Sequence, residues 1–247
     1  MTSRSVVAVL AITTLGFAQS PITGDWRLDS TSGFVALDSS PNGHLGTLAG
    51  FTNDPAQWIA GRFGNALAFD GVDDRVEFAA RGGIPFFTGR GEAFTLALWV
   101  RGAPADGDRI LALANTAQQA PLFALGTGRA AAGTTSRLEL LVRNDQGIES
   151  VRTSSRTVFD GAWHHVAYVE TAGSARLYVD GVIDPANFDD RFGARGSRSV
   201  GYGTYTFDKL ALGAVVQAQS SAHFAGALDD VQVYRCALSA IDVTTIA

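Results

Sequence analysis

The stretch WHHVAYVETAGSARLYVDGV, residues 163–182, decides the fold class. In its second half, apolar and polar residues alternate around Leu177 and Val179, with the two-residue period of a half-buried strand. The pair Asp180-Gly181 interrupts this run, and Asp-Gly suits a tight turn because glycine adopts positive φ at little cost. The stretch therefore predicts a β-hairpin in a protein made of antiparallel strands.

The same alternation continues along the chain beyond Pro21. Leu138, Leu140 and Val142 form one such run, in which polar residues occupy the positions between them. The runs are separated every eight to twelve residues or so by Gly, Asp, Asn or Pro, which is typical of an all-β sandwich. A second Asp-Gly pair, Asp70-Gly71, predicts another hairpin between two strand-like runs.

Helical periodicity is found only at the end of the chain. Ser239 and Asp242 form a capping-box pattern before the apolar residues Val243 and Ile246. No repeat or linker divides the rest of the sequence, and its 247 residues lie within the range of single β-sandwiches. We therefore predict one all-β domain over residues 19–247, a two-sheet antiparallel sandwich with one short C-terminal helix.

Composition and charge exclude several classes of protein. Hydrophobic residues make up 46 % of the chain and charged residues 17 %, so the chain can bury a large core. The formal net charge is −5 and Lys209 is the only lysine, which disfavours nucleic acid as a partner because a phosphate backbone needs a concentrated positive face. The single cysteine, Cys236, cannot form an internal disulfide.

The N-terminus has the pattern of a secretory signal. Arg4 precedes an apolar stretch, residues 6–17, and small residues stand at Gly16 and Ala18. The apolar stretch is shorter than the ~20 residues that a spanning helix needs. We therefore predict a signal peptide over residues 1–18, cleavage after Ala18, a secreted or periplasmic location and no membrane span.

Six segments of the chain resemble a known family. The first is residues 38–48, which end in NGHLGTL, and the others follow in chain order: GRFGNALAFDGVDDRVEF (61–78), FTLALWVRG (94–102), WHHVAYVE (163–170), ARLYVDGV (175–182) and FAGALDDVQVYRCALSA (224–240). Together they resemble the laminin-G-like jelly-roll domains of the concanavalin A-like lectin/glucanase superfamily. This resemblance implies two antiparallel sheets packed face to face. It does not choose a function, because such relatives bind glycans, bind proteins, act as calcium-stabilised spacers or hydrolyse polysaccharides.

The acidic residues argue against catalysis. Glucanases with this fold carry two glutamates and an aspartate on one strand, and retaining hydrolysis needs two carboxyl groups ~5 Å apart. None of the five glutamates has a second acid at that offset: Glu77, Glu92, Glu139, Glu149 and Glu170. Asp73 precedes Glu77, but a turn signal lies between them. We therefore expect no enzyme activity, and a hydrolase with unrecognised catalytic acids is the weaker alternative.

The resemblance also implies a calcium site. In calcium-binding relatives, a carboxylate at the start of the last core strand binds the ion, and Asp229 holds that position here. Asp229 shares strand parity with Val231, so a regular strand would point it toward the core, where an ionised acid needs a partner. Asp29, Asp38 and the carbonyl of Gly71 are the candidate co-ligands. The alternative is that Asp229 accepts hydrogen bonds from backbone amides at a strand end.

Two aromatic pairs are assigned to packing. His164 and His165 are adjacent in a strand and so point to opposite faces, which predicts one buried and one exposed ring rather than a shared metal site. Trp99 and Trp163 lie inside apolar runs and are expected to pack in the core or under loops.

A candidate ligand surface lies in the glycine-rich segment from Phe188 to Phe207. Sugars stack on aromatic rings and hydrogen-bond to nearby polar side chains. The segment supplies both kinds of group, and we select four of them as ligand-binding residues: Arg191, Phe192, Tyr202 and Tyr205. The alternative is a packed loop with solubilising arginines.

These observations favour a secreted, non-catalytic binding module for carbohydrate or a glycosylated surface, with calcium as a possible stabilising ion. The alternative is a structural or adhesive jelly roll that contacts another protein through a sheet face or an edge strand.

Overall fold

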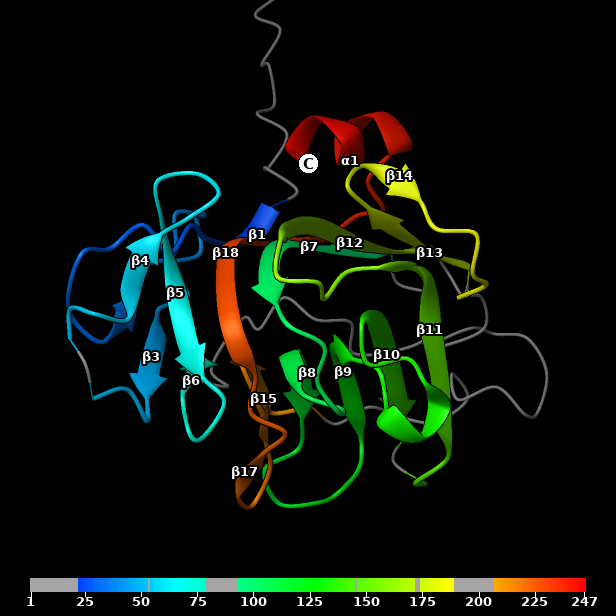
Figure 1. Cartoon of the computed structure of the whole chain (residues 1–247), viewed down its shortest axis with the longest axis horizontal. Coiled ribbons are helices and arrows are strands. Elements are labelled where there is room, and N and C mark those ends of the chain that lie inside the picture. The colour runs from blue at the N-terminus through cyan, green and yellow to red at the C-terminus, as the bar shows by residue number, and fades with distance from the viewer. Residues whose placement is uncertain (1–21, 53, 79–92, 145, 172–173, 189–206) are drawn as a thin grey trace, which may run out of the picture.

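Two antiparallel sheets pack face to face (Figure 1). The computed structural model describes residues 22–52, 54–78, 93–144, 146–171, 174–188 and 207–247. Within these residues, each of the two large sheets has eight strands, and a small two-stranded sheet lies beside them. The predicted all-β sandwich is confirmed. No helix in the described part of the chain has the length and apolar character needed to cross a membrane.

The first sheet, sheet A, has the longest of the described strands, β18, near its middle. Its order is β4 (Trp58–Ala60), β5 (Asn65–Asp70), β18 (Ala225–Tyr234), β7 (Phe94–Gly102), β12 (Trp163–Thr171), β13 (Ser174–Val179) and β14 (Val182–Ile183), read from β4 to β14. The N-terminal strand β1 (Ile22–Trp26) also pairs with β18.

The second sheet, sheet B, contains the strands β11 (Glu149–Thr157), β10 (Arg137–Arg143), β9 (Leu122–Thr127), β8 (Arg109–Ala114), β15 (Lys209–Leu212), β6 (Arg75–Phe78), β3 (Gly46–Ala49) and β2 (Val35–Ala36), in that order. The small sheet pairs β16 (Val215–Val216) with β17 (Ser220–Ser221). A single turn of 3-10 helix, η1 (Ala130–Ala132), precedes β10.

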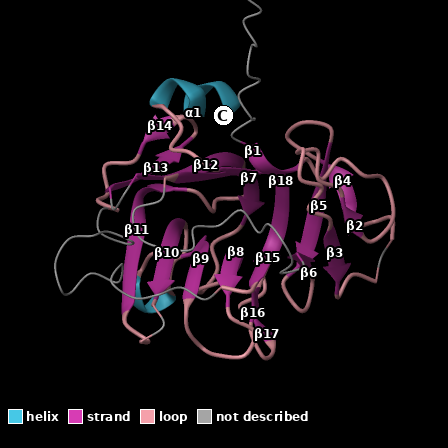
Figure 2. Ribbon diagram, turned by 180° about the vertical axis from the view of Figure 1, so that it is seen from behind, coloured by secondary structure: helices cyan, strands magenta, loops and turns pink. Residues whose placement is uncertain are grey.

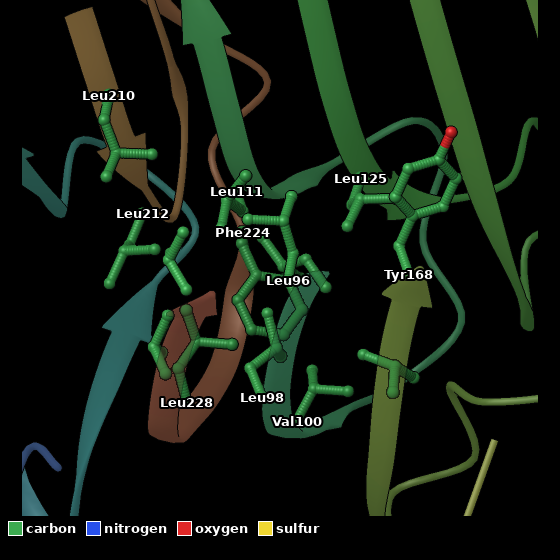
Figure 3. Packing of buried hydrophobic residues seen from close by; sticks show 14 of the residues in the cluster. Leu96, Leu98, Val100, Leu111, Leu125, Tyr168, Leu210, Leu212, Phe224 and Leu228 are labelled. Atoms are coloured by element: carbon green, nitrogen blue, oxygen red, sulfur yellow. The ribbon is translucent and has the colours of Figure 1, made fainter. Parts of the chain in front are cut away.

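The core lies between the two sheets. Figure 3 shows Leu98 and Val100 of β7 and Leu228 of β18 facing Leu111 of β8 and Leu212 of β15. All five side chains are at most 1 % exposed. Full burial of such a side chain contributes about 1.5–3 kcal/mol, so the interface between the sheets dominates stability. The predicted core positions Leu138, Leu140 and Val142 also belong to this cluster.

The Asp180-Gly181 pair forms the predicted hairpin. β13 and β14 pair in register, Val179 with Val182, which leaves two residues in the turn. Both residues have positive φ, 52° and 72°. This is the backbone that a two-residue turn of the I′ type requires, and it explains the Asp-Gly sequence.

The hairpin predicted at Asp70-Gly71 is wrong. β5 belongs to sheet A and β6 to sheet B, so the chain crosses between the sheets here instead of returning beside itself. Gly71 still takes positive φ, 79°, and the Asp70 carboxylate accepts hydrogen bonds from the amides of Val72 and Asp73. The turn chemistry was identified correctly, but the same chemistry serves a hairpin and a crossover.

The C-terminal helix α1 (Ala240–Ile246) confirms the capping-box prediction. The Ser239 hydroxyl accepts from the Asp242 amide, and the Asp242 carboxylate accepts from the Ser239 amide. Val243 is buried against the outer face of sheet A, beside Ala97 and Tyr178. In Figure 2 the helix lies over the β13 and β14 end of the sandwich.

Strand β18 changes partners along its length. Its first four residues, Ala225 to Leu228, pair with β5, and Val231 to Tyr234 pair with β1. On its other side, β7 runs along both parts, with a β-bulge between Asp229 and Gln232. Asp229 and Asp230 therefore occupy the junction at which one neighbour ends and the next begins.

Candidate functional site

The predicted ligand-binding residues Arg191, Phe192, Tyr202 and Tyr205 lie outside the described residues. The predicted metal residues Asp229, Asp29, Asp38 and Gly71 all lie within them.

Asp229 points away from the core, so the parity argument was wrong. It pairs with Trp99 on the outer face of sheet A, whereas its neighbours Leu228 and Val231 both face the core. The bulge adds one residue to β18 between these two, and Asp230 in the bulge has a φ of 44°. An inserted residue shifts the alternation of a strand, so Val231 no longer indicates the direction of Asp229.

The Asp229 carboxylate holds the turn between β4 and β5. Its Oδ2 accepts hydrogen bonds from the amides of Arg62, at 2.7 Å, and Phe63, at 3.0 Å. A Cβ on Gly61 would lie 2.5 Å from that oxygen, so only glycine lets the turn approach so closely. Asp229 is completely buried, and burial raises its pKa despite these hydrogen bonds. The alternative assignment, an acceptor for backbone amides, fits this geometry.

Asp29 supports the same turn, whereas Asp38 stabilises a different loop. Asp29 accepts from the amide of Asn65 at 2.9 Å. Asp38 accepts from the amides of Asp25, Ser40 and His44. Burial works to raise the pKa of Asp38, but these backbone hydrogen bonds outweigh it and lower the pKa. Asp38 therefore closes the loop after β1.

The four predicted metal residues do not form one ligand set. Ala225, at the beginning of β18, pairs with Asp70, and Gly71 follows directly. At ~3.3 Å per residue, Asp229 lies more than about 10 Å further along β18. Among the described residues, the acidic group whose ligand atoms all lie within 4.8 Å of one another is Asp70, Asp73 and Asp74. Calcium binding itself stays a prediction.

A row of polar side chains crosses the outer face of sheet A. His165, Trp99 and Asp229 are direct partners on the adjacent strands β12, β7 and β18. Each is at most 5 % exposed, and each has one buried polar atom without a hydrogen-bond partner among the described residues: His165 Nδ1, Trp99 Nε1 and Asp229 Oδ1. Burial lowers the pKa of His165 to about 4, so its ring is neutral at pH 7.

The β4–β5 turn covers this row. The Phe63 ring meets Trp99 edge-on, with ring centroids 5.9 Å apart, and the Arg62 guanidinium lies 4.8 Å from the Trp99 centroid. Trp99 is thus buried on the outer face, under a turn. Of its two expected roles, packing in the core is wrong and packing under a loop is confirmed. Trp163 lies at the surface end of β12, where Arg101 stacks on it at 4.9 Å.

The two histidines differ in burial, as predicted, and the less buried ring is the one with hydrogen-bond partners. The partly exposed His164 is the ring with partners, Asp180 at 2.8 Å and Asp160 at 3.2 Å. Burial works to lower the pKa of His164, but its hydrogen bonds and the charges of both aspartates raise it overall. The adjacent ring, His165, is buried beside Trp99.

Glu77, the glutamate closest to a second acid, is engaged in ion pairs. Its carboxylate accepts from Arg75 Nε at 2.8 Å and from Lys209 Nζ at 2.9 Å. Burial opposes the shift, but the two cations lower its pKa. A general acid in glycoside hydrolysis needs a raised pKa, so Glu77 does not have the properties of that residue.

A cavity of about 180 Å³ opens where β5 crosses to sheet B. Its lining combines aromatic, amide and carboxylate side chains: Phe51, Thr52, Ala56, Gln57, Ala68, Phe69, Asp70 and Asp74. Sequence analysis missed Gln57 as a site residue, because a single glutamine before a tryptophan carries no signal. The acidic DGVDD turn that supplies Asp70 and Asp74 was visible in the sequence, but it was interpreted only as a turn signal.

Comparison with known proteins identifies the family. A laminin G family model, described as the concanavalin A-like lectin/glucanases superfamily, matches residues 70–244. This match spans more than half of the chain, so the protein belongs to that superfamily. No curated protein sequence matches it.

Solved structures with the same fold include several binding domains. Domain 4 of AbnA, a GH43 extracellular arabinanase from Geobacillus stearothermophilus in complex with arabinotriose, is 18 % identical, with a TM-score of 0.65 over 93 % of this chain and 100 % of that one. The receptor binding domain of botulinum neurotoxin C/D mosaic serotype is 10 % identical, with a TM-score of 0.63 over 92 % of this chain and 50 % of that one. The binding domain of Paraclostridial Mosquitocidal Protein 1 is 12 % identical, with a TM-score of 0.59 over 89 % and 52 %. At these identities the likeness concerns the fold alone.

The hydrogen bonds that the Asp229 carboxylate accepts from the β4–β5 turn predict the effect of replacing this residue. Asp229→Ala leaves the amides of Arg62 and Phe63 without their acceptor, so unfolding free energy should fall by about 2 kcal/mol or more. Asp229→Asn keeps an oxygen acceptor and should lose less. Urea unfolding with calcium and with a chelator measures both. If calcium stabilises the unmodified protein against urea and either variant abolishes this effect, Asp229 binds a cation, and the hydrogen bonds to the turn are not the reason for its stabilising effect.

Asp230 predicts a pH-dependent gain in stability. Burial, followed by the charges of Asp229, Asp25 and Asp29, raises its pKa from 3.8 to about 6. The folded state thus holds this proton more tightly, and the ionised carboxylate destabilises the fold above the folded pKa. Asp230→Asn should raise the melting temperature at about pH 8, and the gain should vanish as pH falls toward the unfolded pKa. Asparagine tolerates the left-handed backbone at this position.

Asp180→Asn is the matched control, because Asp180 also has positive φ but pairs with His164. His164 has a raised pKa, so its ion pairs stabilise the fold below its unfolded pKa and stop doing so as pH rises through the folded value. The control variant should therefore lower the melting temperature on the acid side of neutrality. A loss of stability in Asp230→Asn at about pH 8 would contradict the assignment of Asp230 as a repelled charge.

Proposed function

We propose that the protein is a secreted, non-catalytic module that binds carbohydrate. Membership of a superfamily that includes lectins supports binding, and the AbnA domain with the same fold was solved with arabinotriose. The N-terminal pattern of residues 1–18 supports export.

The chemistry of the cavity at the sheet crossover is the observation that carries this proposal. The carboxylates of Asp70 and Asp74 offer oxygen acceptors, and sugar hydroxyls are donors that match them; Gln57 lines the same cavity. Phe51 and Phe69 supply apolar surface beside these acceptors, and a pyranose or furanose ring presents C–H groups to such surface. Polar groups that converge beside an apolar wall are a feature of small-ligand sites.

Binding to another protein is the second candidate, and one observation favours it. The edge strand β2 of sheet B and the residues on either side of it carry exposed apolar side chains: Val35 in the strand and Phe34 before it are each 43 % exposed, and Leu37 after it is 60 % exposed. Leu45 is 56 % exposed nearby in the chain. An open apolar edge can accept a strand from a partner.

Affinity for polysaccharides tests the carbohydrate proposal. The purified protein, in buffer with calcium, should be retained by at least one immobilised polysaccharide, and arabinan is the first to try. Gln57→Met preserves side-chain volume but removes the polar amide group from the cavity lining, so affinity should fall about tenfold. Reducing-sugar release by the unmodified protein should stay at background.

The control is Gln219→Met, which changes an exposed glutamine away from the cavity and should bind normally. Retention that Gln57→Met leaves intact would place the site elsewhere. Failure to bind any polysaccharide of a broad panel would favour the β2 edge and a protein partner. Turnover abolished by Glu77→Gln would restore the hydrolase alternative.

Export predicts a shorter mature chain. Expression with the natural N-terminus should give a product that begins at Gln19, because Gly16 and Ala18 provide the small residues before the cleavage point. Mass spectrometry of the exported protein measures this directly. A mature species that retains Met1 would contradict both the signal peptide and the secreted location.

A further inference from the structure

We infer that the cavity at the sheet crossover takes a single sugar unit without an acidic group, and that Asp74 is the residue that excludes acidic sugars. The inference rests on the proposed function, because it concerns the same cavity. It goes further by naming the class of ligand: a neutral or amino sugar at a chain end or a branch, and not a uronic acid.

The size of the cavity limits the ligand to one ring. Its volume is about 180 Å³. Sites that enclose drug-sized ligands have volumes of ~300–1,000 Å³, so a chain of several sugars does not fit inside. A sugar in the middle of a chain has a neighbour on both sides, whereas a sugar at an end or a branch has only one. A cavity of this size therefore suits a terminal or branching unit.

Two carboxylates give the cavity its charge. Asp70 and Asp74 both line it, and neither forms an ion pair with a described lysine or arginine. The carboxylate of Asp73 adds to this charge from nearby, since the oxygens of the three acids lie within 4.8 Å of one another. His223 is the neighbouring group that can carry positive charge. The lining is thus negative and holds no permanent positive charge.

Asp74 is the acid on which a second negative charge would act most strongly. It is only 7 % exposed, and its Oδ2 accepts a hydrogen bond from the Asp70 amide at 3.0 Å. Burial raises the pKa of Asp74, and repulsion from Asp70 and Asp73 adds to this effect, which outweighs the hydrogen bond. An acidic sugar would bring further repulsion into surroundings where salt screens charges little.

Asp70 keeps its charge beside Asp74. Burial works to raise the pKa of Asp70, but hydrogen bonds from backbone amides, Val72 and Asp73 among them, outweigh it and lower the pKa. Ionised carboxylates only accept hydrogen bonds. Sugar hydroxyls and the ammonium group of an amino sugar can donate to them, whereas the carboxylate of a uronic acid brings acceptors alone.

The rest of the lining offers an anion little in return. Phe51 and Phe69 pack edge to face, with ring centroids 5.5 Å apart, and contribute apolar surface. The amide nitrogen of Gln57 already donates to the Gly33 carbonyl and to Asp54. Among the described side chains of the lining, the Thr52 hydroxyl is the donor that remains. One hydroxyl does not offset two carboxylates.

Matched sugars test the inference by calorimetric titration of the full chain at about pH 8. Galactose, galacturonic acid and galactosamine form one set, and glucose with its acid and amine forms another, so that each charged sugar differs from the neutral one at a single carbon. The uronic acid should bind about tenfold more weakly or worse than its neutral or amino counterpart, because like charges are brought together. Arabinotriose should bind within about threefold of arabinose, since only one ring enters the cavity.

Asp74→Asn should relieve the discrimination, so that the uronic acid binds within about threefold of the neutral sugar. Such a gain of binding cannot result from misfolding, and the asparagine keeps an oxygen for the Asp70 amide. Asp180→Asn is the matched control. It removes the same charge from the β13–β14 turn at the other edge of sheet A and should discriminate like the unmodified protein.

The outcomes separate the inference from the proposed function. A neutral sugar that binds no better than its uronic acid would overturn the inference and leave the carbohydrate module standing. Discrimination that persists in Asp74→Asn would overturn the role of this residue, and affinity that rises steeply from arabinose to arabinotriose would overturn the single-unit site. If no sugar of any charge binds, and no polysaccharide is retained, the proposed function fails and the inference fails with it.

Discussion

The arrangement of sheet A depends on one buried carboxylate. Asp229 lies where β18 loses β5 as a partner and gains β1, a position at which the ladder of backbone hydrogen bonds is interrupted. Its Oδ2 accepts the amides of Arg62 and Phe63, and so attaches the β4–β5 turn to the middle of the sheet. Asp29 attaches the other end of the turn through Asn65. Two aspartates therefore replace the strand pairing that is missing at this junction.

This solution concentrates negative charge at the junction. Asp229, Asp25 and Asp29 lie close enough to Asp230 that their charges add to the effect of burial and raise the pKa of Asp230. Burying charges without full pairing lowers stability. The same aspartates nevertheless determine which strands lie next to one another. The large apolar core between the sheets makes this loss tolerable. The outer face of sheet A is thus specified by polar contacts, and the inner face by packing.

Sequence reasoning succeeded where one local rule acts alone. Alternation placed Leu138, Leu140 and Val142 in the core, and the capping box located the C-terminal helix. Sequence reasoning failed where one sequence pattern is compatible with two structures. An Asp-Gly turn can close a hairpin, as at Asp180, or can connect strands of different sheets, as at Asp70. A bulge is invisible in the pattern of residues, so the direction of Asp229 could not be inferred from Val231.

The same ambiguity explains why the candidate site was missed. Trp99 belongs to the run FTLALWV, which is apolar on both faces, so its alternation cannot tell the core from the outer face. Gln57 and Asp74 are far apart in sequence and meet only because the chain crosses between sheets after β5. A hairpin at Asp70 would have kept β5 and β6 in one sheet. The crossover instead gathers the acids of the turn against the β4–β5 pair, so the topology that sequence could not predict is also what creates the cavity.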